Sequence, residues 1–118
     1  MAHENNMIVT SRKRIALVQP RGSNWFPGVR DVTDIANRMA PLGILSVGAY
    51  LLQKGHDVFI YDGLGPFAPC DLDEQVRAIL KWKPHIVGFS ATTSSFPDAT
   101  AMAKKVKDQN PSIRIICG

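Results

Sequence analysis

Six consecutive small residues, five of them hydroxylated, follow a short apolar segment in the second half of the chain: Ser90-Ala91-Thr92-Thr93-Ser94-Ser95. Serine and threonine hydroxyls can donate to an amide, a phosphate or a ribose, and their small size leaves room for a bulky ligand. A helix expected from Pro97 onward adds backbone N–H groups and the positive end of its dipole. These residues form a candidate binding loop, and a turn that only caps the next helix would explain the same composition.

Other residue types that carry chemistry do not fall into functional patterns. No GxGxxG or GxxxxGK[ST] occurs, so the usual phosphate-binding glycine loops of dinucleotide and nucleoside-triphosphate sites are missing from the sequence. His3, His56 and His85 fall outside the expected binding loops and are interpreted as surface or capping residues. Cys70 and Cys117 lack a metal-site spacing and are expected to be free thiols. The sequence therefore predicts no catalytic residue and no metal ligand.

The elements that must position the candidate loop alternate between strand and helix. Apolar runs and turn residues predict strands at 14–19, 58–61, 86–89 and 113–117, with helices at 41–54, 71–83 and 97–109. Such alternation is typical of an α/β fold with parallel strands and helices on both faces. We expect a flavodoxin-like (Rossmann-like) doubly wound parallel sheet, apparently truncated after the fourth strand, because such domains usually continue with another helix and strand.

Length and composition indicate one globular core. The chain has 118 residues, of which 45% are hydrophobic and 20% are charged. We expect a flexible tail at 1–13 and an α/β domain at 14–118. Without a long apolar run or a signal pattern, the sequence predicts a cytoplasmic protein with no membrane contact. The net charge is +4, but no aromatic residues interleave with the basic ones, so nucleic-acid binding is not expected.

Four loops are expected to meet at one edge of this sheet. In open parallel sheets, ligands bind beyond the carboxyl ends of the strands, where the strand order reverses. The loops there begin at Gln19, Asp62, Ser90 and Gly118. The sequence therefore places the working surface of the protein at this edge.

Several short motifs occur together in a characteristic order. They are Pro41-Leu42-Gly43-Ile44-Leu45, Gly55-His56-Asp57-Val58, Ile86-Val87-Gly88-Phe89-Ser90 followed by Thr92-Thr93, and Asn110-Pro111. With this order and spacing, the chain resembles the cobalamin (B12)-binding domain that precedes a radical SAM domain. Anaerobic magnesium-protoporphyrin IX monomethyl ester oxidative cyclases and corrinoid methyltransferases have such domains. The resemblance covers residues 14–118.

The resemblance implies cobalamin as the cofactor. In that family the corrin lies over the carboxyl edge of the sheet, and its nucleotide tail enters between strands and loops. The positions that match cofactor-binding segments are Gln19, Pro41, Leu42, Gly43, Ser90, Thr92, Thr93, Ser94 and Gly118. In the broader superfamily a DxHxxG motif supplies a histidine ligand to cobalt. Here residues 19–24 read QPRGSN, so the resemblance implies a lower axial position that is empty or is taken by another group or by water.

The resemblance also implies a larger parent enzyme. A radical SAM domain uses CxxxCxxC to hold a [4Fe-4S] cluster that binds S-adenosylmethionine, and two cysteines cannot supply that motif. The cluster and S-adenosylmethionine are therefore expected only in the parent protein, in a C-terminal radical SAM domain that is the partner of this one. This chain alone is not expected to catalyse a reaction; the parent would be a methyltransferase or an oxidative cyclase.

Two other functions remain open from the residues alone. A flavodoxin-like or receiver-like module could bind another ligand, since topology does not determine function. Alternatively, the irregular segment at 20–40, with Trp25 and Phe26, could dock a protein partner. An uncovered last strand could also pair two copies into a homodimer.

Overall fold

The structure is a computed structural model that describes residues 12–21, 41–65, 68–69, 71–93 and 95–118. Its elements are β1 (Arg14–Gln19), α3 (Leu42–Gln53), β2 (Asp57–Asp62), α4 (Leu72–Lys81), β3 (Ile86–Phe89), α5 (Phe96–Gln109) and β4 (Arg114–Cys117). This alternation confirms the predicted α/β class. The expectations for Trp25, Phe26, Cys70 and Ser94 fall outside the described residues.

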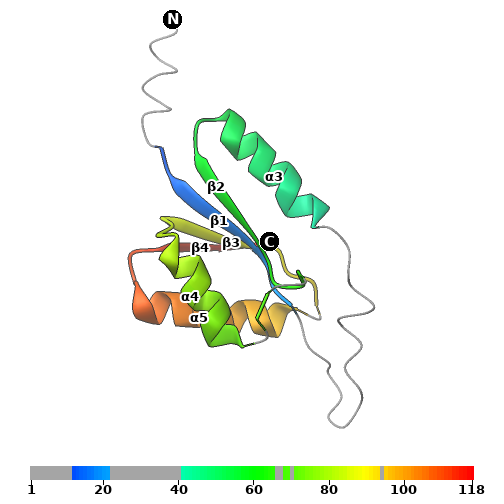
Figure 1. Cartoon of the computed structure of the whole chain (residues 1–118), viewed down its shortest axis with the longest axis vertical. Coiled ribbons are helices and arrows are strands. Elements are labelled where there is room, and N and C mark those ends of the chain that lie inside the picture. Colours follow the sequence, from blue (N-terminus) through cyan, green and yellow to red (C-terminus); the bar gives the residue numbers. More distant parts are fainter. Residues whose placement is uncertain (1–11, 22–40, 66–67, 70, 94) are drawn as a thin grey trace, which may run out of the picture.

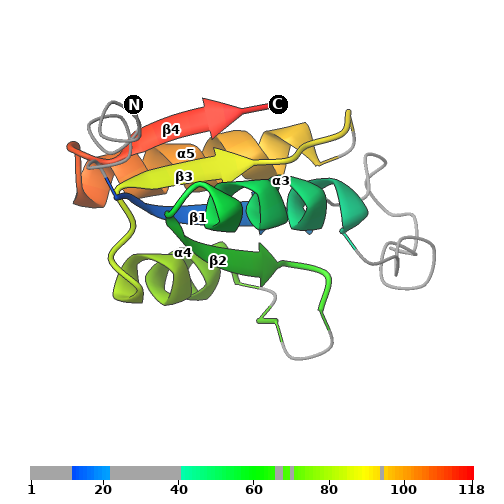
Figure 2. The ribbon, with the colours of Figure 1, turned by 90° about the horizontal axis from the view of Figure 1, so that it is seen from above.

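The four strands form one parallel sheet in the order β2-β1-β3-β4. Helix α3 lies on one face of this sheet, and α4 and α5 lie on the other (Figures 1 and 2). Strand β1 therefore has neighbours on both sides, and the order is that of a flavodoxin-like fold. The carboxyl ends of the strands are level, because Gln19 pairs with Asp62, and Phe89 pairs with both Val18 and Cys117.

Strand β1 is buried on both faces of the sheet. Its alternate residues Ala16 and Val18 join the core under α4 and α5, while Ile15 and Leu17 pack toward α3. The pleat of a strand sends successive side chains to opposite faces, so a strand covered on both sides must be apolar throughout. This requirement explains the continuous apolar run of β1.

Helix α3 packs closely on the sheet because residue 48 is glycine. A Cβ atom at Gly48 would lie 3.1 Å from Ile60 Cδ1 and 3.3 Å from Val58 Cγ1. The opposite side of α3 is also apolar, and its exposed side chains are Leu42, Leu45, Val47, Tyr50 and Leu52. An exposed apolar surface of this kind is typical of a contact with another protein surface or a ligand.

Strands β1 and β3 have the predicted limits, and the limits of the other elements differ from the predicted ones by one or two residues. Strand β2 is longer than the predicted 58–61, because it pairs with β1 over all six residues. Pro41 is the N-cap residue of α3 and not its first helical residue. Strand β4 begins at Arg114, because the strand pairing with β3 begins there, at Ile86. Asp71 is the N-cap residue of α4, and its carboxylate accepts the Asp73 N–H at 3.1 Å.

Three further observations on the described part of the chain concern membrane-spanning helices, metal-ligand clusters and Cys117. None of its helices is both long and apolar enough to cross a bilayer. None of its histidine, cysteine, aspartate and glutamate side chains gather in threes around a position that could hold a metal ion. Cys117 is a free, exposed thiol.

Candidate functional site

The strand order reverses between β1 and β3. These strands are neighbours, but the next helix after β1, α3, lies on one face of the sheet and the next helix after β3, α5, lies on the other (Figure 1). Because these two helices cover opposite faces, the crevice of a doubly wound fold opens between the ends of these strands. The structure thus places Gln19 and Ser90 on either side of the position where such folds bind ligands.

Backbone hydrogen bonds join the loop after β3 to the ends of its neighbours. The Ser90 N–H donates to the Val18 carbonyl at 2.9 Å. Gly118 donates to the Phe89 carbonyl at 3.0 Å, and the Gly118 carbonyl accepts the Ala91 N–H at 3.1 Å. Three strand ends are therefore held together, and they give the hydroxyl loop a fixed base.

The hydroxyl loop divides into structural and exposed residues. The Thr92 N–H donates to Ser95 Oγ at 2.9 Å, and the Ser95 N–H donates to the Thr92 carbonyl at 3.1 Å. Ser95 is buried, whereas Ser90 and Thr93 are exposed. Ser95 therefore takes part in the turn that the composition suggested. The hydroxyl residues Ser90 and Thr93 remain exposed.

The loop after β2 is held against β1 by a glycine, Gly63. The Gly63 N–H donates to the Gln19 carbonyl at 2.8 Å. A Cβ atom at Gly63 would lie 2.7 Å from that carbonyl oxygen and 3.1 Å from the Arg21 nitrogen. Any other residue would therefore push the first and second loops apart.

Gln75 is a further residue that the sequence analysis missed. It is fully buried on α4, and its Nε2 donates to the Pro69 carbonyl at 2.6 Å. Its Oε1, and the Tyr61 hydroxyl on β2, are buried atoms without a hydrogen-bond partner among the described residues. Burial raises the pKa of Tyr61, which keeps its hydroxyl protonated. The sequence signal for Gln75 was a polar residue beside the inward-facing Val76.

The start of α3 lies at the same end of the sheet as the strand termini (Figures 1 and 2). Leu42 is 67% exposed, and a Cβ atom at Gly43 would have nothing within 4 Å. The same openness holds at Gly118. The structure thus brings eight of the predicted positions to one end of the sheet: Gln19, Pro41, Leu42, Gly43, Ser90, Thr92, Thr93 and Gly118.

These residues fit a large, flat cofactor with polar substituents. Open backbone at Gly43 and Gly118 allows a broad ring to approach closely, and exposed hydroxyls at Ser90 and Thr93 can donate to amide or phosphate groups. The unpartnered Gln75 Oε1 lies close beneath the second loop, 3.4 Å from the position of a Cβ at Gly63. The site therefore combines an open rim with polar groups that have not found partners within the described residues.

The fold and the site together agree with a match to a family model. The model of the B12 binding domain matches residues 30–118, which is most of the chain. This chain therefore belongs to the B12-binding domain family, and the resemblance seen in its motifs is confirmed.

Two curated proteins are similar to the chain over about two thirds of its length. An uncharacterised methyltransferase of Pyrococcus horikoshii is 36% identical over 78 residues, which is 66% of this chain and 16% of that protein. The anaerobic magnesium-protoporphyrin IX monomethyl ester cyclase of Synechocystis is 32% identical over 82 residues, 69% of this chain and again 16% of the relative. The matched region is thus a small part of each relative. No solved structure matches the chain.

Proposed function

We propose that this domain holds cobalamin over the carboxyl edge of its sheet and acts as the cofactor-binding part of a larger B12-dependent radical SAM enzyme. The observation that carries the proposal is the reversal of strand order between β1 and β3, with exposed hydroxyls and open glycines beside it. Membership of the B12-binding domain family supports the choice of cofactor. When bound, cobalamin supplies a cobalt centre for group transfer, chemistry that protein side chains lack.

The chain's own residues bind and orient the cofactor in this proposal. Ser90 and Thr93 donate hydrogen bonds to the amide and phosphate groups of the nucleotide tail. Pro41, Leu42 and Gly43 form one side of the rim, and Gly118 lets the ring approach the end of β4. The chain contains no histidine between His3 and His56, so residues 19–24 would not supply the histidine ligand that a DxHxxG motif would provide to cobalt.

The exposed apolar surface of α3 supports the proposal of a partner domain. This surface carries five exposed apolar side chains, and it begins at the same edge as the proposed cofactor site. We propose that a C-terminal radical SAM domain, with a [4Fe-4S] cluster and S-adenosylmethionine, packs near this helix and reaches the cofactor. The parent reaction would be methyl transfer or oxidative ring formation, in keeping with the names of the two relatives, a methyltransferase and a monomethyl ester cyclase.

Titration with hydroxocobalamin tests cofactor binding. We expect the cobalamin absorption spectrum to change and the cofactor to co-elute with the protein on gel filtration. The double variant Ser90→Ala/Thr93→Val should raise the Kd about tenfold, because each hydrogen bond contributes about 0.5–1.5 kcal/mol. Ser112→Ala, which removes a hydroxyl at the opposite end of the sheet, should leave the Kd unchanged. A protein that is folded by circular dichroism and binds no cobalamin would contradict the proposal.

Pairing of two copies along β4 remains a separate prediction. Strand β4 is the last in the sheet order, and Ile116 on it is 58% exposed. An edge strand of this kind presents backbone groups that can pair with another chain. Sedimentation equilibrium would show a dimer, and Ile116→Lys should shift it toward monomer.

A further inference from the structure

A hollow lies at the opposite end of the sheet from the proposed cobalamin site. Its volume is about 830 Å³, and it opens where strands β1, β3 and β4 begin and where helices α4 and α5 end. Its wall includes Lys13, Lys83, His85, Asn110 and Arg114, together with apolar groups such as Ile86. Small-molecule sites have volumes of about 300–1,000 Å³, so this hollow is large enough for one.

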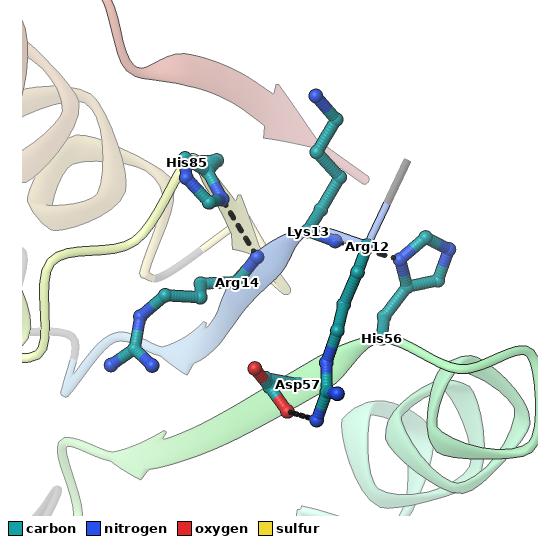
Figure 3. Close-up of polar contacts among 6 residues, drawn as sticks. All are labelled: Arg12, Lys13, Arg14, His56, Asp57 and His85. Atoms are coloured by element: carbon teal, nitrogen blue, oxygen red, sulfur yellow. Dashed lines mark hydrogen bonds and ion pairs between the residues drawn. The ribbon is translucent and has the colours of Figure 1, made fainter. Parts of the chain in front are cut away.

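The wall of the hollow carries positive charge without a carboxylate. Lys13, Lys83 and Arg114 line it, and no aspartate or glutamate of the described ranges does. None of these three side chains forms an ion pair with another residue in the described ranges. In contrast, the neighbouring Arg12 pairs with Asp57 at 2.6 Å, on the side away from Lys13 (Figure 3). The charge in the hollow is therefore not compensated by the described side chains around it.

Helix termini do not account for these cations. The carbonyl groups at the end of α4 attract positive charge, but Arg14 already meets this need. Its guanidinium donates to the Trp82 and Lys83 carbonyls and lies 4.1 Å from the centre of the Trp82 ring. At the end of α5, Lys107 Nζ donates to the Pro111 carbonyl at 3.1 Å. The cations of the hollow are additional to these capping interactions.

Two neutral groups add hydrogen-bond donors to the same wall. His85 Nδ1 accepts the Arg14 N–H at 2.9 Å, so Nε2 carries the hydrogen of the neutral ring (Figure 3). Asn110 Oδ1 accepts both the hydroxyl and the N–H of Ser112, at 2.6 and 3.2 Å. The Asn110 NH₂ group is therefore left to donate. For the Lys13, Lys83, Arg114, His85 and Asn110 side chains, the groups that remain for a ligand are donors, and a ligand rich in acceptors would satisfy them. Gln109 and Ser112 also line the hollow, and their side chains can both donate and accept.

Lys83 occupies a backbone conformation that favours glycine. Its φ angle is +59°, in the left-handed region, directly after the end of α4. The corresponding position after α3 is Gly55, with φ of +92°. A lysine in this conformation lowers the stability of the fold relative to glycine. The backbone preference therefore does not explain why a lysine occurs here, whereas a role for its charge would.

From these observations we infer that the hollow is a second binding site, which takes a small molecule bearing a phosphate or pyrophosphate group. Phosphate oxygens are acceptors with negative charge, and they suit a wall of three cations and two neutral donors. The apolar groups of Ile86 and Leu80 can contact the uncharged part of the ligand. The site lies at the amino ends of the strands, so it does not depend on cobalamin binding at their carboxyl ends.

Calorimetric titration with inorganic pyrophosphate tests the site. We expect saturable binding of one pyrophosphate per chain, and Lys83→Gly and Arg114→Gln should each raise the Kd about tenfold or more. Lys104→Gln is the matched control, because Lys104 is an exposed lysine paired with Asp108 on α5, outside the hollow. Its Kd should stay within about twofold of the unmodified protein.

Each other outcome contradicts the inference. Equal weakening by Lys104→Gln would indicate attraction by net charge alone, and no saturable binding would exclude the site. A second titration with citrate distinguishes the ligand class, and tighter binding of citrate than of pyrophosphate would overturn the assignment to phosphate. Lys83→Gly also relieves backbone strain, so loss of binding in a more stable protein could not be attributed to unfolding.

Discussion

The two ends of the same sheet offer opposite chemistry. At the carboxyl ends of the strands, the groups near the crevice are hydroxyls, glycines and backbone amides, such as those of Ser90, Thr93 and Gly118. At the amino ends they are lysine, arginine and histidine side chains, such as Lys13, Lys83, His85 and Arg114. In a parallel α/β fold every helix begins at the carboxyl edge of the sheet and ends at the amino edge. The free N–H groups of the helices therefore face the carboxyl edge, and their free carbonyls face the amino edge.

The comparison shows that the fold assigns a different kind of ligand to each edge. Backbone donors and small side chains leave space for a large ligand at the carboxyl edge, where the strand order also reverses. Long cationic side chains at the amino edge surround a hollow of about 830 Å³. We therefore expect the two edges to bind different ligands independently while sharing one apolar core.

The largest effect should follow from damage to that shared core. Ile79 is fully buried between α4 and the sheet, and Ile79→Ala should lower the free energy of unfolding by about 2–5 kcal/mol. Cobalamin and pyrophosphate binding should then fall together, in proportion to the folded fraction measured by urea titration. Leu52→Ala, at a 58% exposed position on α3, should change stability by less than about 0.5 kcal/mol. If either cobalamin or pyrophosphate still bound after the fold was lost, the two sites would not depend on a shared core.

A change at Gly63 should separate the two edges. Gly63→Val places side-chain atoms against the Gln19 carbonyl, where a Cβ alone would lie at 2.7 Å. We expect a loss of about 1–3 kcal/mol in stability, a strong loss of cobalamin affinity, and an unchanged pyrophosphate Kd below the melting temperature. Gly118→Ala is the control for stability, since nothing lies within 4 Å of its Cβ position. Equal loss at both edges would show that they are coupled.

The two residues that follow α3 and α4 should respond in opposite directions. Gly55→Ala puts a side chain on a residue with φ of +92° and should cost about 1 kcal/mol, whereas Lys83→Gly should stabilise the protein by a similar amount. For a domain of this size, each change should shift Tm by about 4–8 °C. Neither substitution should alter the cobalamin spectrum. A destabilised Lys83→Gly protein would mean that the lysine side chain supports the fold.

The smallest effect should come from the exposed ion pair beside the amino-edge hollow. Hydrogen bonding to Arg12 lowers the pKa of Asp57 below its usual value of 3.8. This pair therefore stabilises the folded state above that value, and the contribution is lost as the pH falls through the lower pKa of the folded state. The stability difference between the unmodified protein and Asp57→Asn should shrink between neutral pH and about pH 2. About 1 M NaCl should also reduce it at neutral pH, and a difference independent of pH would contradict this explanation.

The hydroxyl loop shows how far sequence reasoning reached. The types of residue at 90–95 and their place after an apolar strand were enough to predict a polar loop at the carboxyl edge. They were not enough to divide the loop, because the buried position of Ser95 and its bond to the Thr92 N–H depend on how α5 packs. Similarly, a buried glutamine on α4 could be noticed as a polar residue beside Val76, but not as a group with an unpartnered oxygen.

The amino-edge hollow shows what the sequence analysis left unseen. Lys13, Lys83, His85 and Arg114 come from three separate regions of the chain, and none of them belongs to a motif. His56 and His85 were interpreted as surface or capping residues, and both accept N–H groups at the start of β1, from Lys13 at 3.1 Å and from Arg14 at 2.9 Å (Figure 3). The runs Arg12-Lys13-Arg14 and Lys83-Pro84 were the available signals.

The sequence by itself determined the alternation of strands and helices, the parallel sheet and the family to which its motifs belong. Local properties suffice for these features, because apolar periodicity, turn residues and short motifs act over neighbouring positions. Only the tertiary structure decided which distant residues meet: the backbone contact of Gly63 with Gln19, and the cluster of cations at the amino edge. Such meetings depend on sheet order and strand register, which arise from packing of the whole chain and not from any one segment.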